Sequence, residues 1–217
     1  MHYIQKHILD ELRLVSSEHY AVLNKHDIES GHFRYHLSQL VTDSYVEQLE
    51  RGIYCLTTKG QQYVDELSSQ RIHPEKMPKV ITYTLLTKGD KFLLQLKPKH
   101  PYKDLYNMVG GKVHLGESTH EAAIREVREK TGQDIVSPKL RGIFEIRIND
   151  DAQLFTHVIA YVYQATLDHT PESLTAFEID QLDNHPQLSP DLLPILKKIT
   201  SSELCVVDTI TASYSAS

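Results

Sequence analysis

Cysteine is scarce in this 217-residue sequence, which contains only Cys55 and Cys205. The two cysteines are 150 residues apart and form no CxxC pair. A disulfide framework or a cysteine-ligated zinc site needs more cysteines at closer spacing. Both residues are therefore typical of ordinary thiols in a reducing cytosol.

The amino terminus lacks a long hydrophobic run, because MHYIQKHILDELRL mixes charged residues with apolar ones. A signal peptide or a membrane span requires a continuous apolar stretch. We therefore expect a soluble, cytoplasmic protein with no membrane partner. The chain is 40% hydrophobic and long enough for two small domains, each with its own core.

An excess of positive charge is also absent, since the formal net charge is −6. Residues 1–75 hold 7 Lys and Arg against 11 Asp and Glu, and residues 76–217 hold 16 against 18. DNA-binding surfaces gain much of their affinity when Lys and Arg replace the counterions of phosphates. The acidic first part argues against strong non-specific DNA binding but leaves room for a small basic patch.

Several common catalytic motifs are missing. The sequence has no GxSxG, no HExxH and no phosphate-binding loop, since GGKV lacks both the earlier glycine and a Ser or Thr after the lysine. It also has no internal repeat and no low-complexity run. The chemistry must therefore come from another pattern.

Apolar residues recur at helical spacing in two places within the first seventy residues. They predict one helix near the amino terminus and another that begins near Ser30. Ser17 is the predicted cap of a short helix between them that ends at Leu23. The apolar stripes are Ile4, Ile8, Leu9 and Leu12 in the first helix and Phe33, Leu37, Leu40 and Val41 in the later one.

The segment EQLERGIYCLTTKG favours a two-stranded hairpin with its turn at residues 50–52, followed by a helix from Gln61 to Leu67. Three helices and such a hairpin resemble the winged helix-turn-helix family over residues 1–70. The resemblance implies that an exposed face of the third helix reads DNA and that the hairpin tip touches phosphate. The candidate DNA-binding residues are His32, Arg34, Tyr35, His36, Gln39 and Arg51. The acidic charge balance keeps an alternative open, in which this unit is a dimerisation or protein-contact module.

The polar stretch SSQRIHPEKMPK predicts a domain boundary, and we place a linker at residues 71–78. Residues 79–200 alternate β-rich runs with two helical patterns, of which the stronger runs from Ser118 to Lys130. This texture indicates an α/β (α+β) domain. The sequence leaves the packing of the tail, residues 201–217, open.

A pair of glycines and three carboxylates surround the start of the stronger helix. Gly110 and Gly111 leave the backbone free to approach a ligand. Glu126 and Glu129 share one helix face, and Glu117 precedes the first turn. Clustered carboxylates repel one another unless a cation neutralises them, and such oxygen ligands suit Mg²⁺ or Mn²⁺. The pattern predicts a divalent metal that neutralises a diphosphate and activates water.

The same stretch, GGKVHLGESTHEAAIREVREKTG, resembles the Nudix box, which reads Gly, any five, Glu, any seven, Arg-Glu-apolar-any-Glu-Glu-any-Gly-apolar. Seven of the eight residues compared match it, namely Gly111, Glu117, Arg125, Glu126, Val127, Glu129 and Gly132. The resemblance extends over residues 79–200. It implies an α/β/α sandwich around a mixed sheet and hydrolysis of a nucleoside diphosphate linked to another group.

The resemblance also implies a role for each polar residue of the box. Glu126 would be the principal metal ligand, or the general base through a metal-bound water. Glu129 would be the second ligand, Glu117 would bind the metal through water, and the carbonyl of Gly110 would add a direct bond. Arg125 would orient the glutamates through ion pairs.

Residues near the box are candidates for substrate binding. Lys97 and Lys99 in KPKHPYK, together with Lys112, can contact the phosphates of a substrate. Tyr102 or Tyr106 can stack on a base. Each of these side chains can instead belong to a solvated loop.

Lys130 departs from the box, because it replaces the second Glu of a pair that commonly coordinates the metal. An ammonium repels a divalent ion and, four residues after Glu126, can pair with that carboxylate. Alternatively, its long stem rotates toward solvent and leaves the carboxylates to hold the ion more weakly. Gln133 replaces the final apolar residue, whose packing Ile135 can take over.

Two functions therefore stay open. One is a hydrolase with Mg²⁺ or Mn²⁺ as cofactor, a nucleotide-derived small molecule as substrate and an appended winged-helix module. The other is a winged-helix transcription regulator whose Nudix domain senses a nucleotide metabolite without hydrolysing it. Because both domain families often dimerise, a homodimer is a further expectation.

Overall fold

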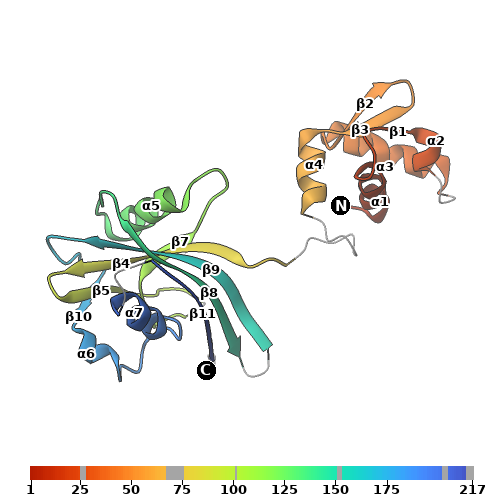
Figure 1. Ribbon diagram of the computed structural model, residues 1–217. Helices are drawn as coiled ribbons and strands as arrows, with labels where there is room; N and C mark the ends of the chain where they lie inside the picture. Colours follow the sequence, from red (N-terminus) through yellow and green to blue (C-terminus); the bar gives the residue numbers. More distant parts are fainter. Residues whose placement is uncertain (25–27, 67–75, 101, 151–152, 202–204, 214–217) are drawn as a thin grey trace. The chain divides into compact units, whose positions relative to one another are not determined.

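The computed structural model describes residues 1–24, 28–66, 76–100, 102–150, 153–201 and 205–213. The chain forms two compact units, Met1–Met77 and Pro78–Ser217, each of which is described by itself below (Figure 1). Most of the predicted linker, residues 71–75, lies outside the described residues.

The described residues of the first unit form four helices and a three-stranded antiparallel sheet with the order β1-β3-β2 (Figure 1). The predicted hairpin is confirmed, with its turn between Glu50 and Ile53. The elements are α1 (Tyr3–Leu12), β1 (Glu18–His19), α2 (Tyr20–Leu23), α3 (Ser30–Thr42), β2 (Val46–Glu50), β3 (Ile53–Leu56) and α4 (Thr58–Asp65).

The core of this unit follows from the spacing of the apolar residues in α1 and α3. Because this spacing matches the helical period, the apolar residues of each helix form one stripe, which packs into the core. Ile8 of α1 and Phe33 of α3 are fully buried in one cluster with Val46 of β2. Two local predictions are wrong. The short helix α2 is capped at His19 rather than at Ser17. Val41 lies on the outer side of α3 and is 37% exposed.

The second unit is built on an eight-stranded mixed sheet. Six of the strands follow the order β10-β5-β4-β9-β8-β11, and the other two are β6, which pairs with β5, and β7, which pairs with β4. The pairs β4·β9 and β8·β11 are parallel, and the remaining pairs are antiparallel. The strands are β4 (Lys79–Lys88), β5 (Lys91–Leu96), β6 (Tyr106–Asn107), β7 (Val109–Lys112), β8 (Lys139–Asp150), β9 (Gln153–Thr166), β10 (Thr175–Phe177) and β11 (Val206–Ser213). The helices are α5 (Thr119–Thr131), α6 (Ile179–Leu182) and α7 (Leu192–Thr200).

The sheet is covered by a helix on each face, as its alternating side chains require. Leu85 of β4 joins the core that contains Ile195 of α7, whereas its neighbour Leu86 joins the core that contains Val127 of α5. Figure 1 shows α5 and α7 on opposite sides of the strands. Helix α5 packs against β7, the strand that contains Gly110 and Gly111.

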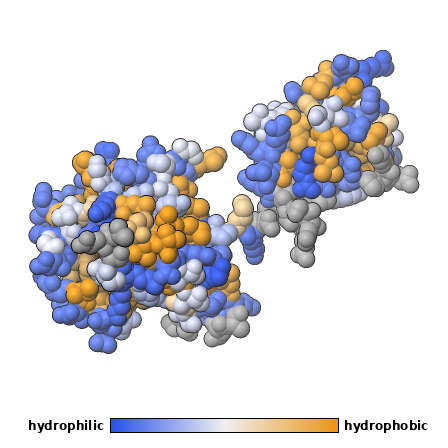
Figure 2. All heavy atoms as spheres, viewed as in Figure 1, coloured by the Kyte–Doolittle hydropathy of each residue, from blue (hydrophilic) through white to orange (hydrophobic). Residues whose placement is uncertain are grey.

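The tail folds into the sheet, since β11 pairs with β8 along its whole length. Residues 202–204 and 214–217 of the predicted tail lie outside the described residues. On the face in view, hydrophilic residues surround smaller apolar patches in both units (Figure 2). Among the described residues, none of the helices has the length and apolar character needed to cross a membrane.

Candidate functional site

Helix α5 has a defined beginning and end. The hydroxyl of Ser118 accepts a hydrogen bond from the backbone N–H of Glu121 at 3.2 Å, and the Glu121 carboxylate accepts one from the N–H of Ser118 at 2.8 Å. This reciprocal pair is a capping box. Gly132 ends the helix in the left-handed conformation, with φ at 69°. These ends confirm the predicted helix to within one residue and fix the register of its carboxylates.

The double glycine lets α5 lie against the strand β7. Gly110 and Gly111 pair with Tyr83 and Thr82 of β4. A Cβ atom on Gly110 would collide with the carbonyl oxygen of Thr82, and one on Gly111 would collide with the carboxylate of Glu126. Gly110 therefore allows the close approach of β4, and Gly111 allows the Glu126 side chain of α5 to lie on the backbone of β7.

Arg125 ties the carboxylates of the box together. Its guanidinium donates to both carboxylate oxygens of Glu117, at 2.6 and 3.0 Å, and to Glu126 at 2.9 Å. It also donates to the backbone carbonyl of Lys112 at 3.0 Å. Hydrogen bonds from Arg125 lower the pKa of Glu117 from 4.5 to about 2. Arg125 therefore holds Glu117 as an anion and fixes the position of its carboxylate.

Lys130 lies between two of the predicted metal ligands. Its ammonium donates to the Glu126 carboxylate at 2.7 Å and to the carbonyl oxygen of Gly110. Glu126 is only 6% exposed. Burial by itself raises the pKa of this carboxyl, but hydrogen bonds from Lys130 and Arg125 outweigh burial, so its pKa lies below the ordinary value. Of the two orientations open to Lys130, the structure has the one that pairs with Glu126.

The four predicted metal ligands do not fit a divalent ion in this arrangement. Lys130 donates hydrogen bonds to the Gly110 carbonyl and to one oxygen of Glu126, and Arg125 donates one to the other oxygen of Glu126. Arg125 also donates hydrogen bonds to both oxygens of Glu117. The side chain of Glu129 is exposed, and its carboxylate lies 3.4 Å from the same guanidinium. A further cation would have to displace Lys130 against the repulsion between like charges.

A pocket of about 450 Å³ opens beside this cluster and is lined by the three lysines predicted to bind substrate, Lys97, Lys99 and Lys112. Lys130 and Lys79 line it as well. The pKa of Lys97 is lowered, first because burial penalises its charged form and then because the charge of Lys130 repels it. An anion placed between these ammonium groups would relieve that repulsion.

A buried polar trio at the pocket was missed by the sequence interpretation. The hydroxyl of Tyr83 donates to the Asp191 carboxylate at 2.9 Å and accepts from the side-chain amide of Asn107 at 3.2 Å. All three residues line the pocket. Burial raises the pKa of Asp191 above its ordinary value. The sequence nearby gives one indication of this role for Asp191, namely that it is an acidic residue in the otherwise apolar stretch that leads into α7. Of the two tyrosines proposed for base stacking, Tyr102 lines the pocket, whereas Tyr106 packs against Phe177.

The predicted DNA-binding residues differ in their exposure to solvent. His32, Arg34, Tyr35 and Arg51 are exposed, and Gln39 is half-buried. His36 is only 7% exposed, so its prediction as a residue on the outer face of α3 is wrong. It lies instead between α3 and the amino terminus, where its ring stacks on that of His2 with centroids 4.0 Å apart.

Comparison with known proteins identifies relatives of this chain. The chain is 28% identical over 159 residues to the ADP-ribose pyrophosphatase of Methanocaldococcus jannaschii, a match that covers 67% of this chain and 89% of that protein. It is 31% identical over 105 residues to the uncharacterised Nudix hydrolase YvcI of Bacillus subtilis, which covers 48% of this chain and less than two thirds, 64%, of that protein.

Solved structures support the mixed α/β fold. A MutT protein from Bacillus halodurans shares 26% identity with a TM-score of 0.50, covering 63% of this chain and 90% of that one. The NUDIX domain of Shewanella oneidensis NrtR, solved in complex with ADP ribose, has 16% identity and a TM-score of 0.50, covering 67% and 98%. Nudix hydrolases are generally dependent on divalent metals, which makes Lys130 a notable departure. The family model for the NUDIX domain matches residues 76–201, and the chain belongs to this family.

Proposed function

We propose that the Nudix domain of this chain binds a nucleoside diphosphate derivative without a divalent metal, and that the ammonium of Lys130 takes the place of the ion. One observation carries the proposal. The Lys130 ammonium contacts both Glu126 and the carbonyl of Gly110, which are the groups expected to bind the metal directly. It supplies a positive charge where a metal would otherwise neutralise a diphosphate.

The pocket suits such a ligand in size and charge. Its volume of about 450 Å³ lies within the range of small-molecule sites. Lys97 and Lys130 already repel each other there, and a diphosphate would neutralise both. ADP-ribose is the probe of choice, because a relative that covers 67% of this chain is an ADP-ribose pyrophosphatase.

A second candidate function is metal-dependent hydrolysis of the same ligand. It is favoured by the intact pairing of Arg125 with Glu117 and by the exposure of Glu129. Lys130 has a flexible side chain that is 26% exposed, so it can turn away and release Glu126. Hydrolysis then requires that Mg²⁺ or Mn²⁺ compete successfully with Lys130.

Calorimetry with the full chain separates the two functions. We expect ADP-ribose to bind in EDTA, with no release of AMP after Mg²⁺ or Mn²⁺ is added. Lys130→Met and Lys97→Met should each abolish binding, whereas Lys139→Met, which changes an exposed lysine outside the pocket, should leave it intact. Binding only with metal, accompanied by AMP release, would establish the hydrolase instead.

We also propose that the first unit is a winged helix-turn-helix domain that contacts DNA. The order of its helices, its three-stranded sheet and its β2–β3 hairpin support this assignment. Exposed Arg34 on α3 and Arg51 at the hairpin turn are the cationic contacts. In gel shifts at low and moderate salt, Arg34→Glu and Arg51→Glu should weaken retardation of the gene's upstream DNA. Absence of specific retardation by the unmodified chain would favour a protein-contact module.

A further inference from the structure

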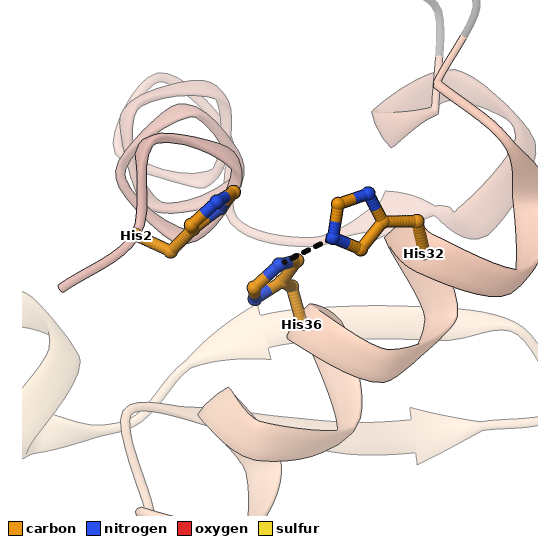
Figure 3. A group of neighbouring side chains, drawn as sticks. All are labelled: His2, His32 and His36. Atoms are coloured by element: carbon orange, nitrogen blue, oxygen red, sulfur yellow. Dashed lines mark hydrogen bonds between the residues drawn. The ribbon is translucent and has the colours of Figure 1, made fainter.

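Three histidines gather in the first unit (Figure 3). His32 and His36 are four residues apart and share one face of α3, and His2 is the N-cap of α1. One ring nitrogen of each histidine lies within 4.8 Å of the others. Neither the Nudix chemistry nor the proposed DNA contacts use this convergence.

The surroundings of His36 favour a neutral imidazole. His36 is 93% buried, and its Nδ1 atom has no hydrogen-bond partner among the described residues. Burial lowers the pKa of His36, and repulsion from His2 and then from His32 lowers it further. Neutral imidazoles present lone pairs, and these make histidine a common ligand for transition metals.

The spacing of the nitrogens suits a small metal ion. The Nε2 atoms of His32 and His36 are 3.2 Å apart. Two nitrogens bound to one tetrahedral Zn²⁺ at about 2.0–2.1 Å lie roughly 3.4 Å from each other. His2 is exposed, and a rotation of its side chain, which gives up the hydrogen bond that its Nδ1 accepts from the N–H of Ile4, can bring the third nitrogen to the same ion. The fourth position then stays open to water or another ligand.

We propose that His2, His32 and His36 form a binding site for a late first-row divalent cation such as Zn²⁺. An all-imidazole ligand set suits Zn²⁺, Ni²⁺ or Cu²⁺ and does not suit Mg²⁺. The ion joins the beginning of α1 to α3, the helix that carries exposed Arg34. It therefore stabilises the packing of the first unit in the same way as a cross-link.

Zinc titration of the 217-residue chain tests this site, using protein without an affinity tag after treatment with a chelator. We expect one Zn²⁺ to bind per chain with a tetrahedral Co²⁺ spectrum on substitution. His2→Ala and His32→Ala should both lose that equivalent. His19→Ala removes an exposed histidine of the same unit outside the cluster and should keep it.

Both substituted histidines are exposed, so the variants are expected to fold, and circular dichroism checks this. Zinc should raise the unfolding temperature of the unmodified chain and of His19→Ala but not that of His32→Ala. The proposal is overturned if the chain binds no Zn²⁺, or if all three variants bind it with unchanged stoichiometry and affinity. Binding retained in the histidine variants would assign the zinc to the carboxylates of the Nudix box.

Discussion

Lys130 stands where the Nudix box has a glutamate, and this departure changes the net charge of the box. With Arg125, Lys130 supplies two cations to a cluster built from Glu117, Glu126 and Glu129. The carboxylates are therefore neutralised largely from within the chain. A divalent ion, which would otherwise be the neutralising partner, gains less from binding here.

Lys130→Glu should restore a metal site. The change removes the ammonium from Glu126 and the Gly110 carbonyl and adds a carboxylate beside them. We expect Mn²⁺ binding to strengthen by tenfold or more, since about 1.4 kcal/mol of altered charge interaction has that effect. Mn²⁺ titration followed by electron paramagnetic resonance measures it, with Lys139→Glu as the control for added negative charge. Equal Mn²⁺ affinity in the unmodified chain and both variants would show that Lys130 does not obstruct the site.

Arg125→Gln should release Glu117. Without the guanidinium, the pKa of Glu117 should rise from about 2 toward 4.5, as carboxyl-selective NMR titration can measure. Because the folded-state pKa is the depressed one, this pair stabilises the protein above about pH 4.5, and the stabilisation is lost as pH falls toward 2. Asp208 is paired with Lys198 elsewhere, so its lowered pKa should not change. An unaltered Glu117 pKa in the variant would exclude the guanidinium as its cause.

At the scale of elements, β11 shows how a polar segment becomes a strand of the sheet. Its residues alternate between half-buried and exposed, with Ile210 as the single fully buried side chain of the strand. Ile210 lies opposite Ile146 of β8, which is itself buried. The strand thereby covers an edge of β8 that would otherwise expose unpaired backbone groups.

Ile210→Ala tests whether β11 contributes to stability. Removing a buried isoleucine typically costs about 2–5 kcal/mol of the free energy of unfolding. Val207 of the same strand is 78% exposed, so Val207→Ala should change that free energy by less than about 0.5 kcal/mol. Urea denaturation monitored by circular dichroism compares the two. Similar small losses for both variants would mean that β11 is not part of the stable fold.

The features that could be predicted from the sequence depend on neighbours in the chain. Ser118, Glu121 and Gly132 define α5 locally, and the i,i+4 spacing anticipated the pairing of Lys130 with Glu126. The contact of Lys130 with Gly110 depends on how α5 packs on β7, which spacing alone does not specify.

The residues that were missed or misplaced join segments far apart in sequence. Asp191 meets Tyr83 across 108 positions, and the buried face of His36 is explained by His2 at the start of α1. The packing of the tail was left open because β11 pairs with β8, a strand far away in the sequence. In each case tertiary contact overrode the local pattern.

At the scale of the whole molecule, the two units have separate cores and carry separate proposed sites. A ligand that binds the Nudix pocket should therefore stabilise the second unit directly. In scanning calorimetry with EDTA, ADP-ribose at 100 times its dissociation constant should stabilise that unit by about 2.7 kcal/mol. Lys97→Met should remove the shift. A shift that appears only when Mg²⁺ is present would indicate that the metal, and not Lys130, completes the site.

The most direct measurement is an anomalous difference map from crystals soaked with Mn²⁺ and ADP-ribose, for the unmodified chain and for Lys130→Glu. If the lysine replaces the ion, the unmodified chain has the Lys130 ammonium between Glu126 and the Gly110 carbonyl and no manganese peak there, whereas the variant has a peak. A manganese peak between those groups in the unmodified chain, with Lys130 turned to solvent, would show instead that the site is a metal centre.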